Sequence, residues 1–357
     1  MSSPRTTILV LVVVIIVLIA GAFTWTWYNR IPTNVAYVTS QDGGISVIDL
    51  NTLQVVKRVY PPNVSPRGLG LTFNGEYLMT ANADTADAAV FDTRGMRLTL
   101  AKRMHVGDNP EFVKINPSGT EMFTSYEPGS GGGPPTAAEL EGATSGPPAR
   151  VVAFNTKNWS QVISFVAGPS TEGLEFSPDG SKLIVANEDE NTVGVYDAAT
   201  GKQLDLIDLS KIGKRPRGVK RSPLGTGYAV TMESSGTLVM LNSNFKVVRS
   251  IQTDVKPYGV AFDQSGKRIF VAAAAAQKLQ VFDADTLKQI GETPIGKRCW
   301  HFTFTPDGSK LLLACGRSDD VYVVDANTYK VIKTIGGFQT PWGILTYPRS
   351  YGSLGLP

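Results

Sequence analysis

Alternating hydrophobic and polar positions recur in short stretches through most of this chain, from about residue 35 to residue 348. Each stretch spans about four to eight residues and is bounded by Gly, Pro, Asn, Asp or Ser. Ser-Pro-Asp-Gly at 177–180 and Gln-Ser-Gly at 264–266 are examples of such boundaries. A two-residue period between turn residues is typical of β-strands, and no segment after residue 30 has helical character. The pattern therefore predicts an all-β domain.

One unit of this pattern occurs seven times. Each copy has a Pro-x-Gly-like triplet, an apolar strand, a turn built on Asp-Gly or Ser-Gly, and a second apolar strand. The middle residues of successive triplets are 44, 61, 45, 41, 42 and 42 residues apart. A period of about 40–45 residues with several short strands per unit predicts a seven-bladed β-propeller. The middle residues, which we expect to face a central funnel, are Arg67, Glu111, Glu172, Arg217, Tyr258, Trp300 and Trp342.

The two ends of the repeat are complementary, which indicates how the ring closes. The first copy begins with the second type of strand at Tyr37–Ser40, and the missing first strand appears near the C-terminus at Pro341–Thr346. One blade therefore takes strands from both ends of the array, so no sheet edge stays open. We expect the propeller to span residues 31–348 and a C-terminal tail to follow at 349–357.

A stretch rich in Gly, Pro and Ala lengthens one copy at residues 128–149, by about 20 residues. Such a composition cannot bury enough apolar area to order itself, so we expect a flexible insert. It joins the second and third strands of its blade, and such loops share a face with the triplets. The insert is either a lid over the funnel or a tolerated surface insertion.

The first 30 residues have a different character. Residues 8–23 are uncharged and almost entirely apolar, and about 20 such residues suffice for a helix that spans a bilayer. Trp25, Trp27 and Tyr28 follow, where an interfacial aromatic belt would lie. The segment is either an uncleaved N-terminal transmembrane anchor or a signal peptide with a cleavage site at Ala20–Ala22. Both interpretations place the propeller outside the cytoplasm, and we expect a single-pass inner-membrane protein with its propeller in the periplasm.

The charge of the chain bears on its possible partners, and its cysteines bear on whether it forms a disulfide. The formal net charge is +3 and no Lys/Arg-rich run is present, so nucleic acid is not an expected partner. The two cysteines, Cys299 and Cys315, fall on opposite arms of one predicted hairpin. They form either a disulfide in an oxidising compartment or a pair of buried thiols.

The funnel positions divide into two arcs of different chemistry. Glu111 and Glu172 lie between Arg67 and Arg217, whereas the other arc is aromatic and includes His301 directly after Trp300. Three interpretations remain open: Arg–Glu pairs that satisfy one another, a ligand or partner site in which rings stack and Arg groups bind carboxylates, or acid–base catalysis by the two Glu. The predicted ligand- or partner-binding residues are Arg67, Glu111, Glu172, Arg217, Tyr258, Trp300, His301 and Trp342.

We assign no catalytic residue and no metal site from the sequence. The chain has two histidines, His105 and His301, too few for a histidine-rich metal site, although one could be an axial ligand to a bound heme. His105 is expected at the surface of an outer strand. The acidic run at 187–190 is interpreted as a solvated turn rather than a calcium loop.

The stretches Tyr37–Ser40 and Ile184–Asn187, with the Ser/Thr-Pro-Asp-Gly turns, resemble the YVTN-repeat β-propellers. Gly296–Gly308 and Phe338–Gly343 are similar to the periplasmic propellers associated with PQQ-dependent alcohol catabolism, and Thr171–Gly173 matches a Pro-Glu-Gly motif of that family. The resemblance implies an accessory protein found beside quinoprotein dehydrogenases and c-type cytochromes. A looser similarity connects the chain to the heme-binding propellers of nitrite reductase and its maturation factors.

The sequence thus predicts a membrane-anchored, extracytoplasmic β-propeller that acts as a protein-binding or assembly module. Its expected partner is a periplasmic or membrane protein of a quinoprotein or respiratory oxidation system, and no cofactor is predicted. The alternative is an enzyme or cofactor-maturation protein that holds PQQ or a heme in the funnel.

Overall fold

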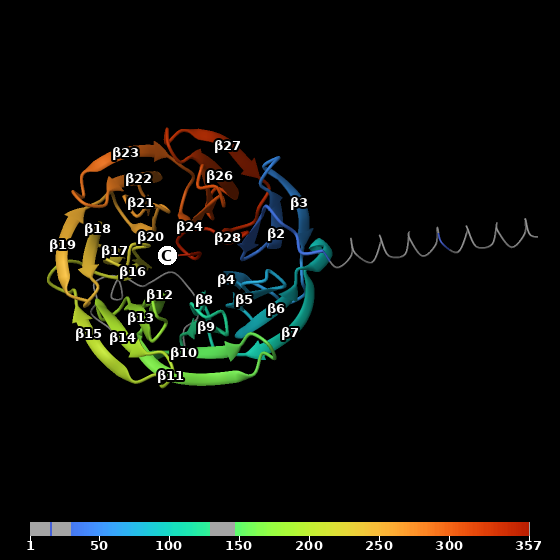
Figure 1. Ribbon diagram of the computed structural model, residues 1–357, viewed down its shortest axis with the longest axis horizontal. Coiled ribbons are helices and arrows are strands. Elements are labelled where there is room, and N and C mark those ends of the chain that lie inside the picture. The colour runs from blue at the N-terminus through green and yellow to red at the C-terminus, as the bar shows by residue number, and fades with distance from the viewer. Residues whose placement is uncertain (1–14, 16–29, 129–146, 357) are drawn as a thin grey trace, which may run out of the picture.

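The computed structural model describes residue 15, residues 30–128 and residues 147–356. Within these ranges, strands β1 to β28 form seven four-stranded antiparallel sheets arranged as the blades of a ring (Figure 1). The prediction of an all-β, seven-bladed propeller is confirmed. We call the centre of the ring, where the innermost strands of all blades meet, the hub.

In every blade, one strand lies at the hub and the other three lie at increasing distances from it. The innermost strands are β28 (Pro341–Tyr347), β4 (Pro66–Leu71), β8 (Val113–Ile115), β12 (Thr171–Phe176), β16 (Pro216–Arg221), β20 (Pro257–Phe262) and β24 (Cys299–Phe304). The second strands are β1 (Val35–Ser40), β5 (Tyr77–Asn82), β9 (Glu121–Tyr126), β13 (Lys182–Asn187), β17 (Gly227–Met232), β21 (Arg268–Ala273) and β25 (Lys310–Cys315).

The outer half of each blade completes the sheet. The third strands are β2 (Gly44–Asp49), β6 (Asp87–Asp92), β10 (Pro148–Asn155), β14 (Thr192–Asp197), β18 (Thr237–Asn242), β22 (Lys278–Asp283) and β26 (Asp320–Asp325). The outermost strands are β3 (Gln54–Val59), β7 (Thr99–His105), β11 (Gln161–Pro169), β15 (Gln203–Asp208), β19 (Val247–Gln252), β23 (Gln289–Pro294) and β27 (Val331–Gly336). A short 3₁₀ helix, η1 (Arg94–Met96), follows β6.

The ring closes as the sequence predicts. Strand β28 pairs with β1, so the sheet in the order β28-β1-β2-β3 combines the two ends of the propeller. The register aligns Ala36 with Thr346 and Val38 with Ile344. Because β28 and β1 come from opposite ends of the propeller and pair within one blade, no unpaired strand edge remains where these two ends meet.

The hydrophobic core lies between neighbouring blades. All six residues of β1 and of β20 are buried, whereas five of the six residues of β19 at the rim are exposed. Aromatic rings join adjacent blades, as in the edge-to-face contact of Phe270 with Phe304, whose ring centroids are 5.1 Å apart. Each blade therefore needs its neighbours to bury its two faces, and the propeller folds as a single unit.

Two predictions fall mainly on residues that the structure does not describe. The proposed membrane anchor at 1–30 lies almost wholly in residues 1–14 and 16–29, and the insert at 128–149 lies mostly in 129–146. In the part of the chain that the structure describes, we find no helix with the length and hydrophobicity needed to cross a bilayer.

Candidate functional site

The triplets lie where the chain enters the hub. In most blades the middle residue is the second residue of the innermost strand, as with Arg217 in β16 and Tyr258 in β20, whereas Glu111 lies just before β8. The third residue is usually Gly because the next blade approaches closely: a Cβ on Gly173 would lie 2.4 Å from the carbonyl oxygen of Arg217. This contact places the middle residues of adjacent blades side by side.

Two triplets carry a large side chain in place of Gly, and these side chains meet in the hub. The ring of His301 lies with its centroid 5.2 Å from that of Phe112, although the two come from blades on different sides of the ring. Tyr258 and Trp342 complete the surroundings of His301, with centroids 5.3 Å and 4.4 Å from it. The aromatic arc of the sequence is therefore a compact cluster around one imidazole.

His301 is buried and neutral. Its exposed fraction is 1%, and desolvation, with the nearby positive charges of Arg217 and Lys220, lowers the pKa of its imidazole well below the usual value. Nδ1 lies 3.1 Å from the hydroxyl oxygen of Ser353, while Nε2 has no hydrogen-bond partner among the described residues. A buried polar atom without a partner is uncommon and marks a place where a ligand can bind.

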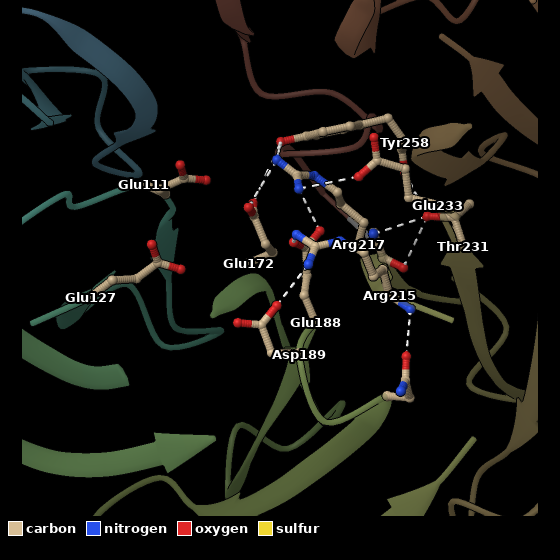
Figure 2. A network of polar contacts seen from close by, with 12 residues as sticks. Glu111, Glu127, Glu172, Glu188, Asp189, Arg215, Arg217, Thr231, Glu233 and Tyr258 are labelled. Carbon is tan, nitrogen blue, oxygen red and sulfur yellow. Dashed lines mark hydrogen bonds and ion pairs between the residues drawn. The ribbon is translucent and has the colours of Figure 1, made fainter. Parts of the chain in front are cut away.

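On the other side of the hub, Arg217 is part of a network of polar contacts (Figure 2). Its Nη2 lies 2.8 Å from Glu172 Oε1 and donates a 2.7 Å hydrogen bond to the hydroxyl of Tyr258, and its Nη1 contacts Glu188 and, at 3.2 Å, Glu233. The guanidinium also lies over the Tyr258 ring, 4.2 Å from its centroid. One cation thus faces three carboxylates, and all of these groups are nearly buried.

Two of the carboxylates around Arg217, those of Glu172 and Glu188, retain protons more readily than usual. Burial raises the pKa of Glu188 to about 7 against the opposing attraction of Arg217 and Arg215. Burial, with repulsion from Glu111 and Glu188, also raises the pKa of Glu172 well above its usual range despite the attraction of Arg217. Arg215 contacts Glu188 and, at 2.7 Å, Asp189. Glu188 therefore has a second guanidinium group as a counter-ion. This cluster can store a proton near neutral pH.

Arg67 and Glu111 form the adjoining pair. Their side chains are in contact, and Arg67 Nη1 also donates a 2.7 Å hydrogen bond to Asn109 Oδ1. Burial opposes the ionisation of Glu111, but the positive charges of Arg67 and Arg217, together with hydrogen bonds from neighbouring side chains, outweigh it and hold the pKa of Glu111 below the usual value. Glu111 is therefore ionised at the pH at which Glu172 is protonated, which separates the roles of the two neighbouring carboxyl groups.

A second layer of charge lies three residues further along the innermost strands. Lys114 and Lys220 both contact Glu175 Oε2, at 3.0 Å and 3.2 Å, and the three side chains are almost completely buried. The two ammonium groups hold the pKa of Glu175 at about 2 against the effect of burial. Both lysines also donate to the carbonyl oxygen of Gly355, at 3.0 Å and 2.9 Å. The C-terminal tail therefore reaches the hub and contacts this layer.

Trp300 and Trp342 are 6% and 3% exposed, and Trp342 lies beside His301. The strand that carries Trp300 is fixed by a disulfide between Cys299 and Cys315, which are directly opposite one another in the register of β24 and β25. Both cysteines are buried. The bond thus links the first residue of the triplet to the neighbouring strand.

We expect the Cys299→Ala/Cys315→Ala double variant to be less stable by about 2–3 kcal/mol, because the cross-link limits the unfolded chain. Urea unfolding of the oxidised protein, the reduced protein and the variant measures this effect. Reduced wild-type protein should unfold near the midpoint of the variant. Equal midpoints for oxidised and reduced wild-type protein would contradict the prediction.

Seven of the eight predicted funnel residues are brought together at the hub, Trp300 lies next to His301 in the chain on the innermost strand β24, and both predicted Arg–Glu pairs are present. Residues 188–190 form a turn, as predicted, but the prediction that the acidic run is solvated holds for Glu190 alone: Glu188 has no exposed surface and contacts Arg215 and Arg217. His105 is exposed on β7, away from the site. Sequence reasoning missed several hub residues, which are Lys114, Glu175, Glu188, Asp189, Arg215, Lys220, Glu233 and Ser353.

Comparison with known proteins identifies the family to which this chain belongs. Residues 151–349, more than half of the chain, match the model of the cytochrome D1 heme domain. The chain belongs to the cytochrome D1 heme domain family. The prediction that the protein has no cofactor is contradicted by this match, because the family is a heme domain. The comparisons favour the alternative interpretation, in which the hub holds a heme.

Individual proteins are also similar to this chain. The chain is 22% identical to protein NirF of Stutzerimonas stutzeri over 343 residues, which cover 88% of this chain and 81% of NirF. The structure of dihydro-heme d1 dehydrogenase NirN in complex with DHE is similar with a TM-score of 0.62 and 17% identity, over 88% of this chain and 75% of NirN. A protein of unknown function from Desulfotomaculum acetoxidans gives a TM-score of 0.73 at 15% identity, over 87% and 98% of the two chains. The structural likenesses show a shared propeller fold.

The residues at the hub fit a heme group. Iron in heme proteins binds a neutral imidazole nitrogen, and His301 offers Nε2 from a buried, neutral ring without another partner among the described residues. The rings of Phe112, Tyr258 and Trp342 supply apolar and π-stacking surface next to this nitrogen. The adjacent guanidinium groups of Arg67 and Arg217 are suited to the carboxylates of a macrocycle.

Proposed function

We propose that this protein binds heme d1, or a dihydro-heme d1 precursor, at its hub and takes part in heme d1 maturation. The observation that carries the proposal is the buried, neutral His301, whose Nε2 has no hydrogen-bond partner in the described part of a chain from a heme-domain family. The similarity to NirF and to the dihydro-heme d1 dehydrogenase NirN supports maturation as the setting.

Different hub residues would contact different parts of the heme. His301 would hold the iron through Nε2, and Tyr258 and Trp342 would contact the ring system. Arg67 and Arg217 would pair with its carboxylates, for which their present partners Glu111 and Glu172 would have to yield in part. When bound, the group would supply an iron centre and an oxidisable macrocycle.

The carboxyl groups of Glu172 and Glu188 give the site a means of moving protons. Their raised pKa values keep protons on these buried groups near neutral pH, when Glu111 is already ionised. Tyr258 lies between them and the imidazole, with its hydroxyl 3.5 Å from Glu172 Oε2. A protonated carboxyl group of this kind can donate a proton to a bound ligand and regain it from solvent.

An extracytoplasmic location is part of the proposal. The buried Cys299–Cys315 disulfide supports it, because such bonds persist in the periplasm and not in a reducing cytosol. The membrane anchor and a periplasmic or membrane protein partner stay predictions from the sequence. The YVTN-repeat resemblance and the association with PQQ-dependent alcohol catabolism gain no support from these relatives, which lead to heme d1 proteins.

Titration of the purified protein with heme d1, followed by absorption spectroscopy, tests the proposal. We expect saturable binding and the spectrum of a histidine-ligated iron. The His301→Gln variant should bind at least about tenfold more weakly and lose that spectrum, because a metal ligand is removed. His105→Gln is the matched control, since this exposed histidine should bind like wild type. Equal affinities for the two variants would contradict the assignment of His301.

A further inference from the structure

The last described residues of the chain, 349–356, lie in the hub rather than outside the ring (Figure 1). They run along β24, where the amide of Phe304 donates to the carbonyl of Tyr351 at 2.8 Å and the amide of Ser353 donates to the carbonyl of Phe302 at 2.9 Å. Gly352 allows this approach, because a Cβ there would lie 2.8 Å from the carbonyl oxygen of Phe302. The tail is therefore a structural part of the site.

Both ends of this segment are fixed. Ser350 Oγ forms hydrogen bonds with the hydroxyls of Thr303 and Thr346, at 3.1 Å and 2.7 Å. Five residues later, the carbonyl of Gly355 accepts hydrogen bonds from two buried lysines. Ser353 lies between these two anchors, so its hydroxyl group has a defined position next to His301.

The hydrogen bonds of Ser353 determine which nitrogen of His301 carries the proton. A hydroxyl group has one hydrogen and two lone pairs. The amide of Phe302 donates to Ser353 Oγ at 3.0 Å, and the hydroxyl donates to the carbonyl of Phe302 at 3.1 Å. One lone pair remains, and it faces Nδ1 of His301 at 3.1 Å. Nδ1 therefore carries the hydrogen and donates it.

The opposite tautomer leaves a costlier group unsatisfied. If the hydroxyl of Ser353 donated to Nδ1, the hydrogen of the imidazole would be on Nε2, which has no acceptor among the described residues. A buried N–H without an acceptor is rarer in proteins than an under-used lone pair. The hydroxyl would also lose its bond to the carbonyl of Phe302. The arrangement thus favours an Nδ1–H imidazole with a lone pair on Nε2.

We propose that Ser353 is a positioning residue for the heme-binding histidine: its hydroxyl oxygen accepts the Nδ1–H of His301 and keeps the lone pair of Nε2 directed at the ligand. The inference rests on the proposed function, in which His301 binds heme iron. A hydrogen bond to the distant nitrogen of a ligating histidine fixes its tautomer and orientation and increases its basicity. In this protein the C-terminal tail, and not a neighbouring strand, provides that bond.

The first test needs no heme. Nitrogen-15 NMR of the imidazole groups distinguishes a protonated from an unprotonated ring nitrogen, and the chain has two histidines, so the assignment is simple. We expect a hydrogen on Nδ1 of His301 in the wild type and a mixture of tautomers in Ser353→Ala. Ser353→Thr retains the hydroxyl and should keep the wild-type tautomer. An unchanged tautomer in Ser353→Ala overturns the proposal.

The second test measures binding. Ser353→Ala should bind heme d1 about tenfold more weakly than wild type and shift the reduction potential of the bound iron to a more positive value, since the imidazole becomes a weaker donor. Ser353→Thr should restore both quantities. The matched control is Tyr351→Phe, which also removes a hydroxyl group from the tail but leaves Ser353 and the anchors at Ser350 and Gly355 in place.

The outcomes separate this inference from the proposed function. If Tyr351→Phe alters tautomer, affinity and potential as much as Ser353→Ala, the tail acts through docking in general and the proposal is overturned. If wild-type protein binds no heme d1, the proposed function fails. The NMR result then still decides whether Ser353 fixes the tautomer of His301, while its role toward a ligand is lost.

Discussion

Replacing Glu175 with Gln should lower the free energy of unfolding by about 3–5 kcal/mol at pH 7, because two buried ammonium groups lose their counter-ion. Lys114 and Lys220 both contact Glu175, and neither side chain has more than 8% of its surface exposed. The amide of Gln can still accept a hydrogen bond, but it carries no charge. Urea unfolding followed by tryptophan fluorescence measures the difference.

The pH dependence of stability gives this prediction a second signature. The folded-state pKa of Glu175 is about 2, below its usual value of about 4.5, so the stability it contributes is present above pH 4.5 and is lost as pH falls toward 2. A shift of this size corresponds to about 3 kcal/mol. The variant cannot titrate at this position and should lose less stability over that range than wild type.

The titration of Lys220 should affect stability at higher pH. Desolvation already lowers the pKa of Lys220 well below the usual value, and loss of Glu175 removes the attraction that opposes this shift. A base whose folded-state pKa is depressed binds fewer protons when folded, so stability should rise with pH between 7 and 10, more steeply in the variant than in wild type. Parallel curves for the two proteins would contradict this account.

A matched control separates the effect of burial on stability from the effect of replacing Glu with Gln. Glu292 forms an ion pair with Lys278 at 3.2 Å on the exposed outer strand β23, and Glu292→Gln makes the same chemical change there. Exposed pairs contribute little, so this control should unfold close to wild type. Equal losses for the two variants would show that the buried layer has no special role. If Glu175→Gln fails to accumulate, adding Lys220→Met should recover folded protein, because one uncompensated cation is removed.

Replacing Arg217 with Gln should also be strongly destabilising, and the loss should depend on pH. The variant removes the cation shared by Glu172, Glu188 and Glu233, and we expect a loss of about 3–5 kcal/mol at pH 8. Without Arg217 the pKa values of Glu172 and Glu188 rise further. Since a carboxyl group with a raised folded-state pKa loses its stabilising contribution as pH increases, the deficit should be smaller at pH 5 than at pH 8.

Urea unfolding at pH 5, 6.5 and 8 measures this difference. The control is Arg249→Gln, in which an exposed guanidinium that donates to two backbone carbonyls, those of Asp285 and Thr286, is replaced by the same amide. The control should show a small loss that is the same at each pH. A pH-independent deficit in Arg217→Gln would contradict the assignment of shared, partly protonated carboxyl groups.

The parts of this structure that follow from local pattern could be predicted from the sequence. The period of the triplets defines the blades, and the position of Pro341–Thr346 defines the closure, because both depend on strand alternation and turn chemistry. The triplets also identified the hub residues, since each lies at the same point of a repeated unit. Cys299 and Cys315 could be placed opposite one another by counting from their shared turn.

Residues that reach the hub from outside the triplets could not be found in this way. Glu188 follows a second strand, where a run of acidic residues normally means a solvated turn, and its partner Arg215 precedes its triplet. Only the packing of two blades brings them together. A signal did exist for Lys114, Glu175 and Lys220, because each charged residue lies three positions after a triplet centre within an otherwise apolar strand.

The family assignment depended on information of another kind. A single buried histidine has many explanations, and the sequence offers no pattern around His301 that distinguishes a heme ligand from a core residue. Its environment is built from Phe112, Tyr258, Trp342 and the C-terminal tail, which are separated by up to about 240 residues in the chain. Such a site becomes visible when the ring is closed and the tail is in place.

The position of the tail has a practical and a temporal consequence. Neither the ring nor the histidine pocket can be completed before strand β28 and residues 349–356 have been synthesised, because both are built from these segments. A purification tag fused directly after this segment would start in the middle of the ring and would compete with the docking of Gly355. Tags for experiments on cofactor loading should therefore be placed away from this segment.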